Sequence, residues 1–435
     1  MIFDVRNFGA VGDGVTLNTT AIQAAIDECA KCGGGRVLFE NGTYMTGTFI
    51  LRSNVNIHIE SNAVLLGSPD CADYPEHETT HVESKLLPRW RNACMIYADE
   101  CENIALTGMG TIDCNGKHFV RLVEPEETAV RDAKDIEKLV RELPPEKTKA
   151  LRYIRYMDRP TPPRCVFFTG CKNVKIEDIT MINQPAGWSY WIHDCDYVTF
   201  DKVKINASLE FPNNDGIHVN SSRNVTISNC SISCCDDCII VRANNVSLKE
   251  NKVCERVVVT NCNLTSYASG IRIGWINDGV IRNCSFSNLV MTDTSVGINI
   301  MLPLRVPNPE NPSSSDIGRE DTLIENLTFS NVMMGQHCGR PVQITVHEDK
   351  FVRCKAIRNI YFNNVHSEGP MLPNISGRED MHIKNIWFND CSFTCTTGDE
   401  IPNRDCHGAG TGKGVYPMEI RYADVKFNNT AISML

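Results

Sequence analysis

Short strand-like segments of one form recur along this chain, and this repetition constrains the fold more than any other feature. From about residue 100 onward they follow the form Asn-Val-x-Ile/Phe-x-Asn-Cys/Val, mostly about 22 to 33 residues apart, which is the period range of solenoids. Apolar residues alternate with polar ones, and valine, isoleucine and phenylalanine dominate, which favours strands over helices. Parallel stacking of such units predicts an all-β, single-stranded, right-handed parallel β-helix. The segments are ENIALTG, KNVKIED, DYVTFDK, RNVTISN, RVVVTNC, GVIRNC, ENLTFSN, RNIYFNN and KNIWFND.

The repeats also bear on turns and on domain count. Asparagine at a fixed place in the units fits turns that need left-handed backbone geometry, so we expect most of these asparagines to be structural. A chain of 435 residues would ordinarily form several domains, but stacked repeats escape that limit. We therefore expect one β-helix domain over residues 1–435, with residues 1–65 as the N-terminal cap and first coils.

Two segments depart from the strand pattern. From Asn18 to Cys29, apolar residues at helical spacing predict an amphipathic helix that begins with a polar cap and ends before Gly33. Such a helix would cover the open end of the solenoid, where strands are otherwise unpaired. A second helical pattern, rich in Glu, Lys and Arg, predicts a helical insertion over about residues 117–159. A solvated flap is its plainer interpretation, and a substrate lid or an oligomer contact are the alternatives.

Composition excludes several classes of partner. With 43 basic and 53 acidic residues, the chain offers no overall basic face, so we expect neither a nucleic-acid nor a membrane partner. The first residues show no secretory signal pattern, and no run of about 18 apolar residues occurs, which predicts a cytoplasmic location. Composition leaves the oligomeric state open.

The cysteines predict buried, reduced thiols. Their number, 21, is odd, and no export signal accompanies them. The run from Cys234 to Cys238 has no partner pair at metal-ligand spacing, so zinc is the weaker interpretation there. Four cysteines follow the same strand pattern and predict a ladder of small buried side chains: Cys230, Cys262, Cys284 and Cys391.

Four strand-like segments can be aligned with one another. They are Asp215-Gly-Ile-His-Val, Asp237-Cys-Ile-Ile-Val, Ser269-Gly-Ile-Arg-Ile and Val296-Gly-Ile-Asn-Ile. The third and fifth residues of each are aliphatic and should point inward, so the fourth should point outward. Neighbouring turns lie about 4.8 Å apart, so Asp215 and Asp237 should converge, with Asp236 as a third carboxylate. The predicted outward column consists of His218, Ile240, Arg272 and Asn299.

Three neighbouring carboxylates repel one another, and a metal ion, a cationic substrate or a retained proton must relieve that repulsion. A protonated carboxyl beside ionised carboxylates is what hydrolysis of a glycoside requires. Two plainer interpretations remain at this point: aspartates that only cap turns, and a calcium site.

A family resemblance attaches to the same residues. The run Pro212-Asn213-Asn214-Asp215-Gly216-Ile217-His218-Val219, followed about 22 residues later by Asp236-Asp237-Cys238-Ile239, is similar to glycoside hydrolase family 28, the polygalacturonases. The N-terminal FGAVGDG, the strand ladder and the surroundings of Trp188 share the resemblance. It implies an inverting glycosidase for a pectin-type saccharide, galacturonan or rhamnogalacturonan-like, that needs no metal or cofactor. It also implies Asp236 as general acid, with Asp215 and Asp237 activating water.

Two family motifs are altered. The family's Gly-His-Gly stands here as Ala268-Ser269-Gly270, and its Arg-Ile-Lys as Asn299-Ile300-Met301. In the family these residues support the acid and bind the galacturonate carboxylate. We therefore do not expect ordinary endo-polygalacturonase activity, and Arg272 could supply a relocated fork for a carboxylate or for sugar hydroxyls. The expected cytoplasmic location suits short imported oligosaccharides, so we expect exo-action on a uronate- or rhamnose-containing oligomer.

Several residues beside the aspartates are predicted to bind substrate, and an inverting site should hold its acid and base carboxyls about 6.5 to 9.5 Å apart. Trp191 is either a sugar-stacking platform or part of a buried aromatic stack. The predicted substrate-binding residues are Asn213, His218, Arg272, Asn299 and Trp191.

Two other functions compete with hydrolysis. β-Helix polysaccharide lyases bind calcium through aspartates and use a base, often arginine, a role that Arg272 could fill. A non-catalytic carbohydrate-binding β-helix is the alternative outside enzymes, and fold alone does not decide between them.

Overall fold

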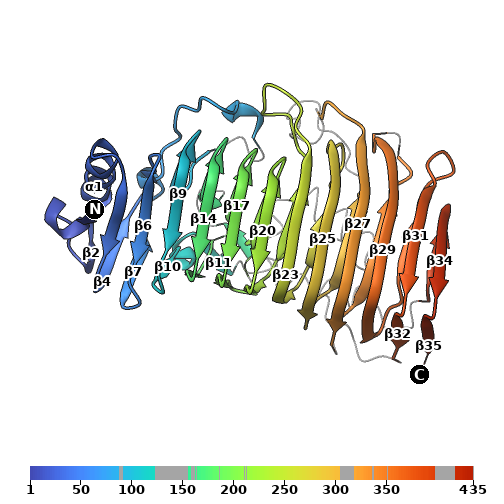
Figure 1. Cartoon of the computed structure of the whole chain (residues 1–435). Helices are drawn as coiled ribbons and strands as arrows, with labels where there is room; N and C mark the ends of the chain where they lie inside the picture. The colour runs from blue at the N-terminus through green and yellow to red at the C-terminus, as the bar shows by residue number, and fades with distance from the viewer. Residues whose placement is uncertain are drawn as a thin grey trace.

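The computed structural model describes residues 1–87, 92–122, 155–157, 162, 164–185, 187–209, 211, 213–303, 318–335, 338–349, 351–396 and 417–434. In these residues the chain coils into two large sheets of parallel strands, and the turns of the coil lie side by side from the N-terminus to the C-terminus (Figure 1). The smaller sheet has eleven strands, in the order β5 (Phe49–Ile50), β8 (Ile96–Asp99), β13 (Arg164–Thr169), β16 (Trp188–His193), β19 (Ile217–Asn220), β22 (Ile239–Arg242), β24 (Ser269–Ile273), β26 (Val296–Leu302), β28 (Arg340–Val346), β30 (Asn374–Ser376) and β33 (Glu419–Arg421).

The larger sheet contains the remaining parallel strands. Its 22 members are β1 (Ile2–Asp4), β2 (Asp13–Leu17), β3 (Gly35–Phe39), β4 (Gly42–Thr46), β6 (Val55–Ile59), β7 (Ala63–Gly67), β9 (Glu102–Thr107), β10 (Thr111–Asp113), β14 (Lys172–Glu177), β15 (Thr180–Ile182), β17 (Asp196–Asp201), β18 (Lys204–Asn206), β20 (Arg223–Ser228), β21 (Ser231–Cys234), β23 (Cys254–Ser266), β25 (Val280–Met291), β27 (Thr322–Met334), β29 (Cys354–Gly369), β31 (Ile383–Asn389), β32 (Ser392–Cys395), β34 (Ala423–Asn428) and β35 (Ala431–Met434).

One turn of the coil shows how the architecture arises. Strands β14 and β15 lie in the larger sheet and β16 in the smaller one, after which the chain returns to the larger sheet with β17. Each strand pairs in parallel with its counterpart one turn later: β14 with β17, β15 with β18 and β16 with β19. This connectivity makes the fold a parallel β-helix, as the repeats predict.

Asparagines form the turns between strands. Asn54, Asn103 and Asn173 all have positive φ angles, and their side chains form a ladder across successive turns. The amide of Asn173 donates to the Oδ1 of Asn103 at 2.7 Å, and the amide of Asn103 donates to that of Asn54 at 2.8 Å. The left-handed backbone is one that asparagine tolerates well, so the structural role predicted for these residues is confirmed.

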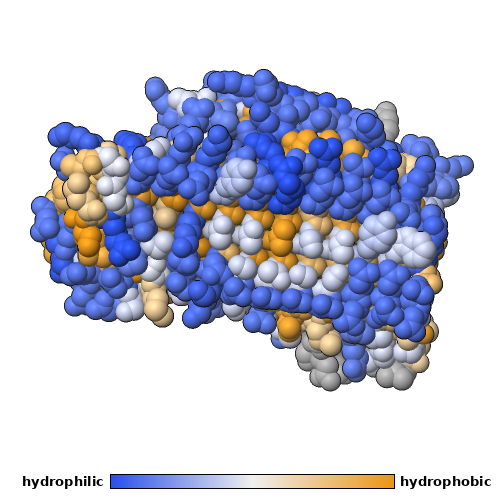
Figure 2. Space-filling model, viewed as in Figure 1, coloured by the Kyte–Doolittle hydropathy of each residue, from blue (hydrophilic) through white to orange (hydrophobic). Residues whose placement is uncertain are grey.

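The core is a set of stacked columns inside the coil, each made of the same inward position on successive strands. One column is a phenylalanine stack whose ring centroids lie between 4.7 and 5.4 Å apart. Its buried members are Phe286, Phe329, Phe362 and Phe388, and the stack ends on Phe427, which is 41% exposed. The outer face of the larger sheet instead shows a band of apolar and intermediate residues bordered by hydrophilic ones (Figure 2). Outward positions aligned across its central strands are Thr199, Thr226, Val258, Ser285 and Thr328.

The cysteine ladder is only partly as predicted. All four cysteines of the expected ladder are buried, and Cys230 and Cys262 are adjacent in one column, to which Cys391 also belongs. Cys284 lies in a different column, because its strand places it beside Leu327 rather than beside Cys262. The local Asn-Cys pattern recurs at two turn positions of the coil, and the sequence pattern alone does not separate them.

The helix α1 (Thr19–Lys31) is the α-helix of the described residues and lies at the N-terminal end of the coil (Figure 1). It contacts β1, β3, β5 and β6 and buries an apolar side that includes Ile22 and Ile26. Asn18 precedes it, but its side chain makes no capping bond. Asn18 thus stands at the expected N-cap position, but the expected side-chain cap is wrong, because the Asn18 amide instead bridges the backbone of Val11, accepting at 2.7 Å and donating at 3.0 Å.

The predicted helical insertion at 117–159 lies mostly outside the described residues. Its ends are described as η5 (Gly116–His118) and an antiparallel pair, β11 (Val120–Leu122) and β12 (Arg155–Met157). The other short 3-10 helices of the described residues are η1 (Val5–Phe8), η2 (Cys71–Asp73) and η3 (Ser84–Leu86). Among the described residues, none of the helices has the length and apolar character needed to cross a membrane.

Candidate active site

The strands β19, β22, β24 and β26 position the outward column that the sequence predicts. Their register pairs His218 with Ile240, Ile240 with Arg272, and Arg272 with Asn299. The flanking aliphatic residues of each strand, such as Ile217 in β19, belong to the core cluster inside the coil. The predicted alignment of the four segments is therefore confirmed, and these side chains lie on the outer face of the smaller sheet.

Three aspartates converge at the edge where β19 and β22 begin. One carboxylate oxygen from each of Asp215, Asp236 and Asp237 lies within 4.8 Å of one from each of the others. Gly216 makes this approach feasible, because a Cβ there would lie 2.2 Å from the carbonyl oxygen of Cys238. The aspartates are 5%, 2% and 7% exposed, respectively, so Asp236 is not the surface group that its predicted role suggests.

Neighbouring side chains fix the orientation of these carboxylates. The Nε2 of His218 lies 2.8 Å from the Oδ2 of Asp215, and the His218 ring stacks on Trp188 at 4.0 Å between centroids. Asp236 accepts a hydrogen bond from the Nδ2 of Asn213 at 2.8 Å and another from the backbone N–H of Asp237 at 2.9 Å. His218 and Asn213 thus hold the aspartates, a placement that the sequence pattern did not specify.

The carboxylate spacing differs from the expected range for an inverting site. The closest oxygens lie within 4.8 Å, whereas inverting glycosidases generally separate their acid and base carboxyls by about 6.5 to 9.5 Å. The cluster brings its carboxylates closer because two of them, Asp236 and Asp237, are consecutive in the chain. The spacing therefore gives no support to inversion, which is implied by the family resemblance alone.

Two turns further along the outward column, Arg272 is only 1% exposed and is not the open fork expected. Its guanidinium stacks over Trp275 at 4.5 Å and donates to the carbonyls of Gly274 at 3.4 Å and Met301 at 3.1 Å. The next residue of the column, Asn299, donates to the Oγ of Ser269 at 3.0 Å. The sequence pattern did not identify Trp275, although it stands only three residues after Arg272.

A buried ion pair fixes the loop that carries Trp275. Asp278 is fully buried and accepts two bonds of 2.7 Å from Arg242, in the bidentate geometry that favours a single orientation. The same carboxylate accepts the backbone N–H of Trp275 at 3.1 Å. This pair therefore orients the aromatic ring beneath Arg272.

Trp191 is buried, so it is not a sugar platform, and the alternative interpretation holds. One side of its ring system stacks on Phe167 at 4.6 Å and another on His193 at 4.8 Å, while its exposure is 1%. Arg164 lies over the same ring at 4.3 Å and is itself fully buried. No sequence motif pointed to Arg164, because it stands alone at the start of β13.

The outward face is covered on the N-terminal side of the aspartates. The column continues from His218 back through Trp191, Phe167 and Tyr97. Residues 77–87, here called the strap, cross this part of the face. They bury Val82 and Leu87 in an apolar cluster with those aromatic residues and Leu248. The outward face is therefore covered on the turns of the coil that precede the aspartate cluster.

The aspartate cluster is also where the described residues can hold a cation. Among them it is the group of His, Cys, Asp and Glu side chains whose ligand atoms converge within 4.8 Å. Oxygen-only ligands suit hard cations such as calcium. The chemistry of the cluster is therefore either proton transfer or cation binding.

Comparisons with known proteins point to one family. The model for glycosyl hydrolases family 28 matches residues 146–368, just over half of the chain. A model described as rhamnogalacturonase A/epimerase, pectate lyase-like, matches residues 2–87. Among solved structures, the exopolygalacturonase of Thermotoga maritima is similar with a TM-score of 0.71 at 20% identity, covering 100% of this chain and 92% of that one. The family 28 exopolygalacturonase of Yersinia enterocolitica gives 0.65 at 20% identity, covering 100% and 78%.

Curated relatives carry related names. A probable polygalacturonase of Vitis vinifera is 25% identical over 303 residues, which is 68% of this chain and 55% of the relative. An exo-poly-alpha-D-galacturonosidase of Dickeya chrysanthemi is 28% identical over 257 residues, 55% of this chain and 41% of the relative. The chain thus spans about half the length of these two proteins.

Proposed function

The chain belongs to glycosyl hydrolases family 28, and on that premise we propose that it hydrolyses the glycosidic bonds of a galacturonan-type saccharide. The observation that carries the proposal is the convergence of Asp215, Asp236 and Asp237 at one edge of the outward face. The names of the relatives support galacturonan as the substrate class, while the match of residues 2–87 keeps rhamnogalacturonan as the second candidate.

In the proposed mechanism, one proton resides within the cluster. Three buried carboxylates this close cannot all be ionised at low cost, so retention of a proton relieves their repulsion. Asp236 donates that proton to the leaving oxygen, and Asp215 with Asp237 activates a water molecule. His218 keeps Asp215 turned toward the water position, and Asn213 holds Asp236 in the position from which it donates its proton to the leaving oxygen. The activated water attacks the anomeric carbon on the face opposite the leaving group, and the anomeric configuration is inverted.

Recognition of the uronate carboxylate falls to the Arg272 region in this proposal. Arg272 and Asn299 lie on the two positions of the outward column that follow Ile240, beyond the catalytic turn. The stack on Trp275 holds the guanidinium in place, and because Arg272 is only 1% exposed, its contribution is the positive charge it places under the outward face and not an open fork. This supplies a local cation on a chain whose formal net charge is -10.

We also propose that cleavage is exo-acting. The strap closes the outward face beside the aspartates, so a saccharide chain cannot continue past them in that direction. Independently of the mode of cleavage, we propose that the whole chain is one β-helix domain, with α1 as its N-terminal cap and a helical insertion within residues 117–159.

A panel of long oligogalacturonates and rhamnogalacturonan fragments tests substrate and mode together. Size-resolved products at early times should consist of a single short saccharide and substrates shortened by that unit. Cleavage of rhamnogalacturonan alone would identify this second candidate as the substrate. Early products of all intermediate lengths would contradict exo-action.

A further inference from the structure

The strap covers the outward face beside the aspartates, and this covered face is here called the closed end of the groove. One polar pair holds the edge of the strap. We propose that His81 and Asp194 form a latch that holds the strap across the groove, which makes His81 a positioning residue for the exo mode of cleavage. The proposal rests on the proposed function, and it adds a residue outside the aspartate cluster that sets where the saccharide is cut.

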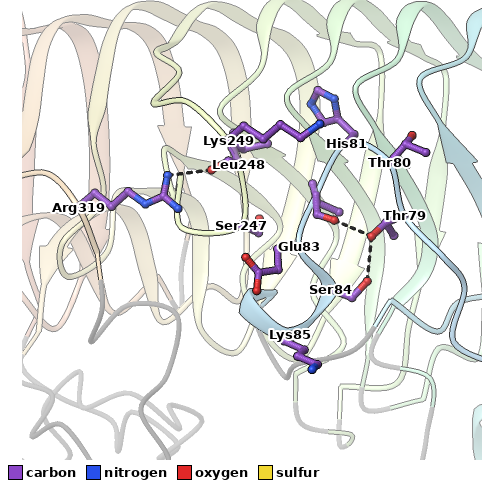
Figure 3. A pocket seen from close by; sticks show the side chains of 11 residues that line it. Thr79, Thr80, His81, Glu83, Ser84, Lys85, Ser247, Leu248, Lys249 and Arg319 are labelled. Carbon is purple, nitrogen blue, oxygen red and sulfur yellow. Dashed lines mark hydrogen bonds between the residues drawn. The ribbon is translucent and has the colours of Figure 1, made fainter.

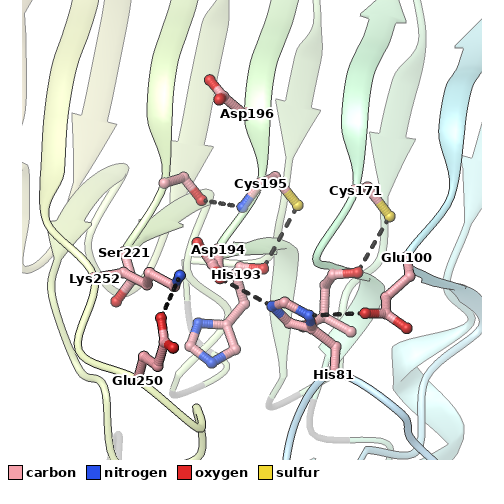
Figure 4. A network of polar contacts seen from close by, with 12 residues as sticks. His81, Glu100, Cys171, His193, Asp194, Cys195, Asp196, Ser221, Glu250 and Lys252 are labelled. Carbon is pink, nitrogen blue, oxygen red and sulfur yellow. Dashed lines mark hydrogen bonds and ion pairs between the residues drawn. The ribbon is translucent and has the colours of Figure 1, made fainter.

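The contacts of the latch join three turns of the coil (Figure 4). The Nε2 of His81 lies 2.9 Å from the Oδ2 of Asp194, and its Nδ1 lies 3.4 Å from the Oε1 of Glu100. The neighbouring Thr80 donates its backbone N–H to the Oδ2 of Asp99 at 2.8 Å. Asp194 has a side chain only 5% exposed, so its bond to His81 is well shielded from water.

The coil is shaped to receive the imidazole ring. Gly170 has a φ of +62°, and a Cβ there would lie 2.6 Å from the Nδ1 of His81. A larger residue would therefore displace the ring as well as strain the backbone. This fit distinguishes the latch from an ion pair formed by chance on an open surface.

The rest of the strap is held unevenly. Val82 and Leu87 anchor its inner side in the apolar cluster, and the N–H of Glu83 donates to the carbonyl of Ser247 at 2.8 Å. The strap also borders a solvent-open pocket of about 520 Å³, which Lys249 and Arg319 line from the other side (Figure 3). His81 itself lines this pocket, so the latch lies on the solvent-accessible side of the strap.

Protonation of His81 should control the latch. The hydrogen bond to Asp194, with a further contribution from Glu100, raises the pKa of His81 above its ordinary value of 6.5. The free energy by which the latch stabilises the docked strap is therefore fully present below about pH 6.5. It is lost as the pH rises through the raised pKa of His81. His193 beside it does not compete for protons, because burial lowers its pKa to about 3. The charged groups around the latch are Asp194, Glu100, Asp99, Arg223, Lys249, Glu83 and Lys85.

Hydrogen exchange of the full-length protein measures the latch directly. At about pH 6, His81→Asn should speed exchange of amides in residues 77–87 roughly tenfold, because a charge-assisted hydrogen bond is lost. The matched control is His58→Asn, which removes a hydrogen bond of 2.8 Å to Thr107 on the other sheet and should leave the strap unchanged. In the unmodified protein, protection factors of the strap should fall between about pH 6 and pH 9, and His81→Asn should abolish that dependence.

Product patterns complete the test. On a long oligogalacturonate, His81→Asn should add products of intermediate length that the unmodified protein does not release. Equal strap protection in His81→Asn and the unmodified protein would overturn the latch. If the unmodified protein itself cuts internally, the role of His81 in exo-action falls, and exchange still decides whether the latch exists. A protein inactive on every saccharide would contradict the proposed function instead.

Discussion

Asp236 is the residue on which the proposed chemistry depends most. Replacing it by asparagine removes the transferable proton, so Asp236→Asn should lower kcat on the true substrate by about 10²- to 10⁴-fold or more. Asparagine keeps the size and one acceptor for Asn213 while relieving carboxylate repulsion, so the free energy of unfolding should change by no more than about 2 kcal/mol. Kinetics and thermal unfolding of both proteins measure the two quantities.

A matched control separates loss of the proton from loss of an acidic side chain in general. Asp178 stands in a turn with a φ of 63°, which asparagine adopts equally well, and it lies outside the aspartate cluster. Asp178→Asn should therefore retain activity. Full activity in Asp236→Asn would remove this residue from the acid role.

The repeats in the sequence predict which residues of the site share one face of the coil. Strand alternation and the spacing of repeats place Asp215, Asp237 and Arg272 on one outward face, because each property is local in sequence. Burial is not local: Trp275 arrives from a loop beneath Arg272, and the strap comes from residues far earlier in the chain. This is why the sequence pattern overestimates the exposure of Arg272 and leaves the burial of Trp191 open.

Among the elements, the close approach of β19 and β22 decides whether the site forms. Gly216 lies at this approach, and a methyl group there would meet the carbonyl oxygen of Cys238 at 2.2 Å. Gly216→Ala should force the two strands apart, lower the free energy of unfolding by about 1 to 3 kcal/mol and reduce activity strongly. Denaturant unfolding and initial rates provide the two measurements.

The control for that prediction is Gly335→Ala. The nearest atom to its added methyl group would be the Cγ2 of Thr292 at 3.5 Å, an ordinary van der Waals contact. This variant should keep both stability and activity within the error of the unmodified protein. If Gly216→Ala behaves the same way, the strands have more freedom than the structure gives them.

Element boundaries show where sequence patterns stop being sufficient. The strands and the helical spacing before Gly33 follow from periodic apolar positions. The side chain of Asn18 does not, because a tertiary partner, the backbone of Val11, competes with the expected cap of α1. Likewise, Cys284 falls in another column from Cys262, since two turn positions share one local sequence pattern.

For the whole molecule, the coil acts as a scaffold that repeats one outward position along its length. Apart from Ile240, polar and aromatic residues occupy that position from Tyr97 to Asn299, and loops decide which part of the face stays covered. The repeats thus predict the fold, whereas the proposed exo mode of cleavage rests on the strap, whose course across the face no periodicity encodes.

Time-resolved proton NMR of an α-linked galacturonate oligomer with the full-length protein tests whether the aspartate cluster hydrolyses the glycosidic bond. Hydrolysis with inversion should produce new reducing ends that appear first as the β-anomer. Added chelator should leave the rate unchanged. Vinyl proton signals of an unsaturated sugar, with activity lost to the chelator, would instead establish a lyase, and first release of the α-anomer would contradict inversion.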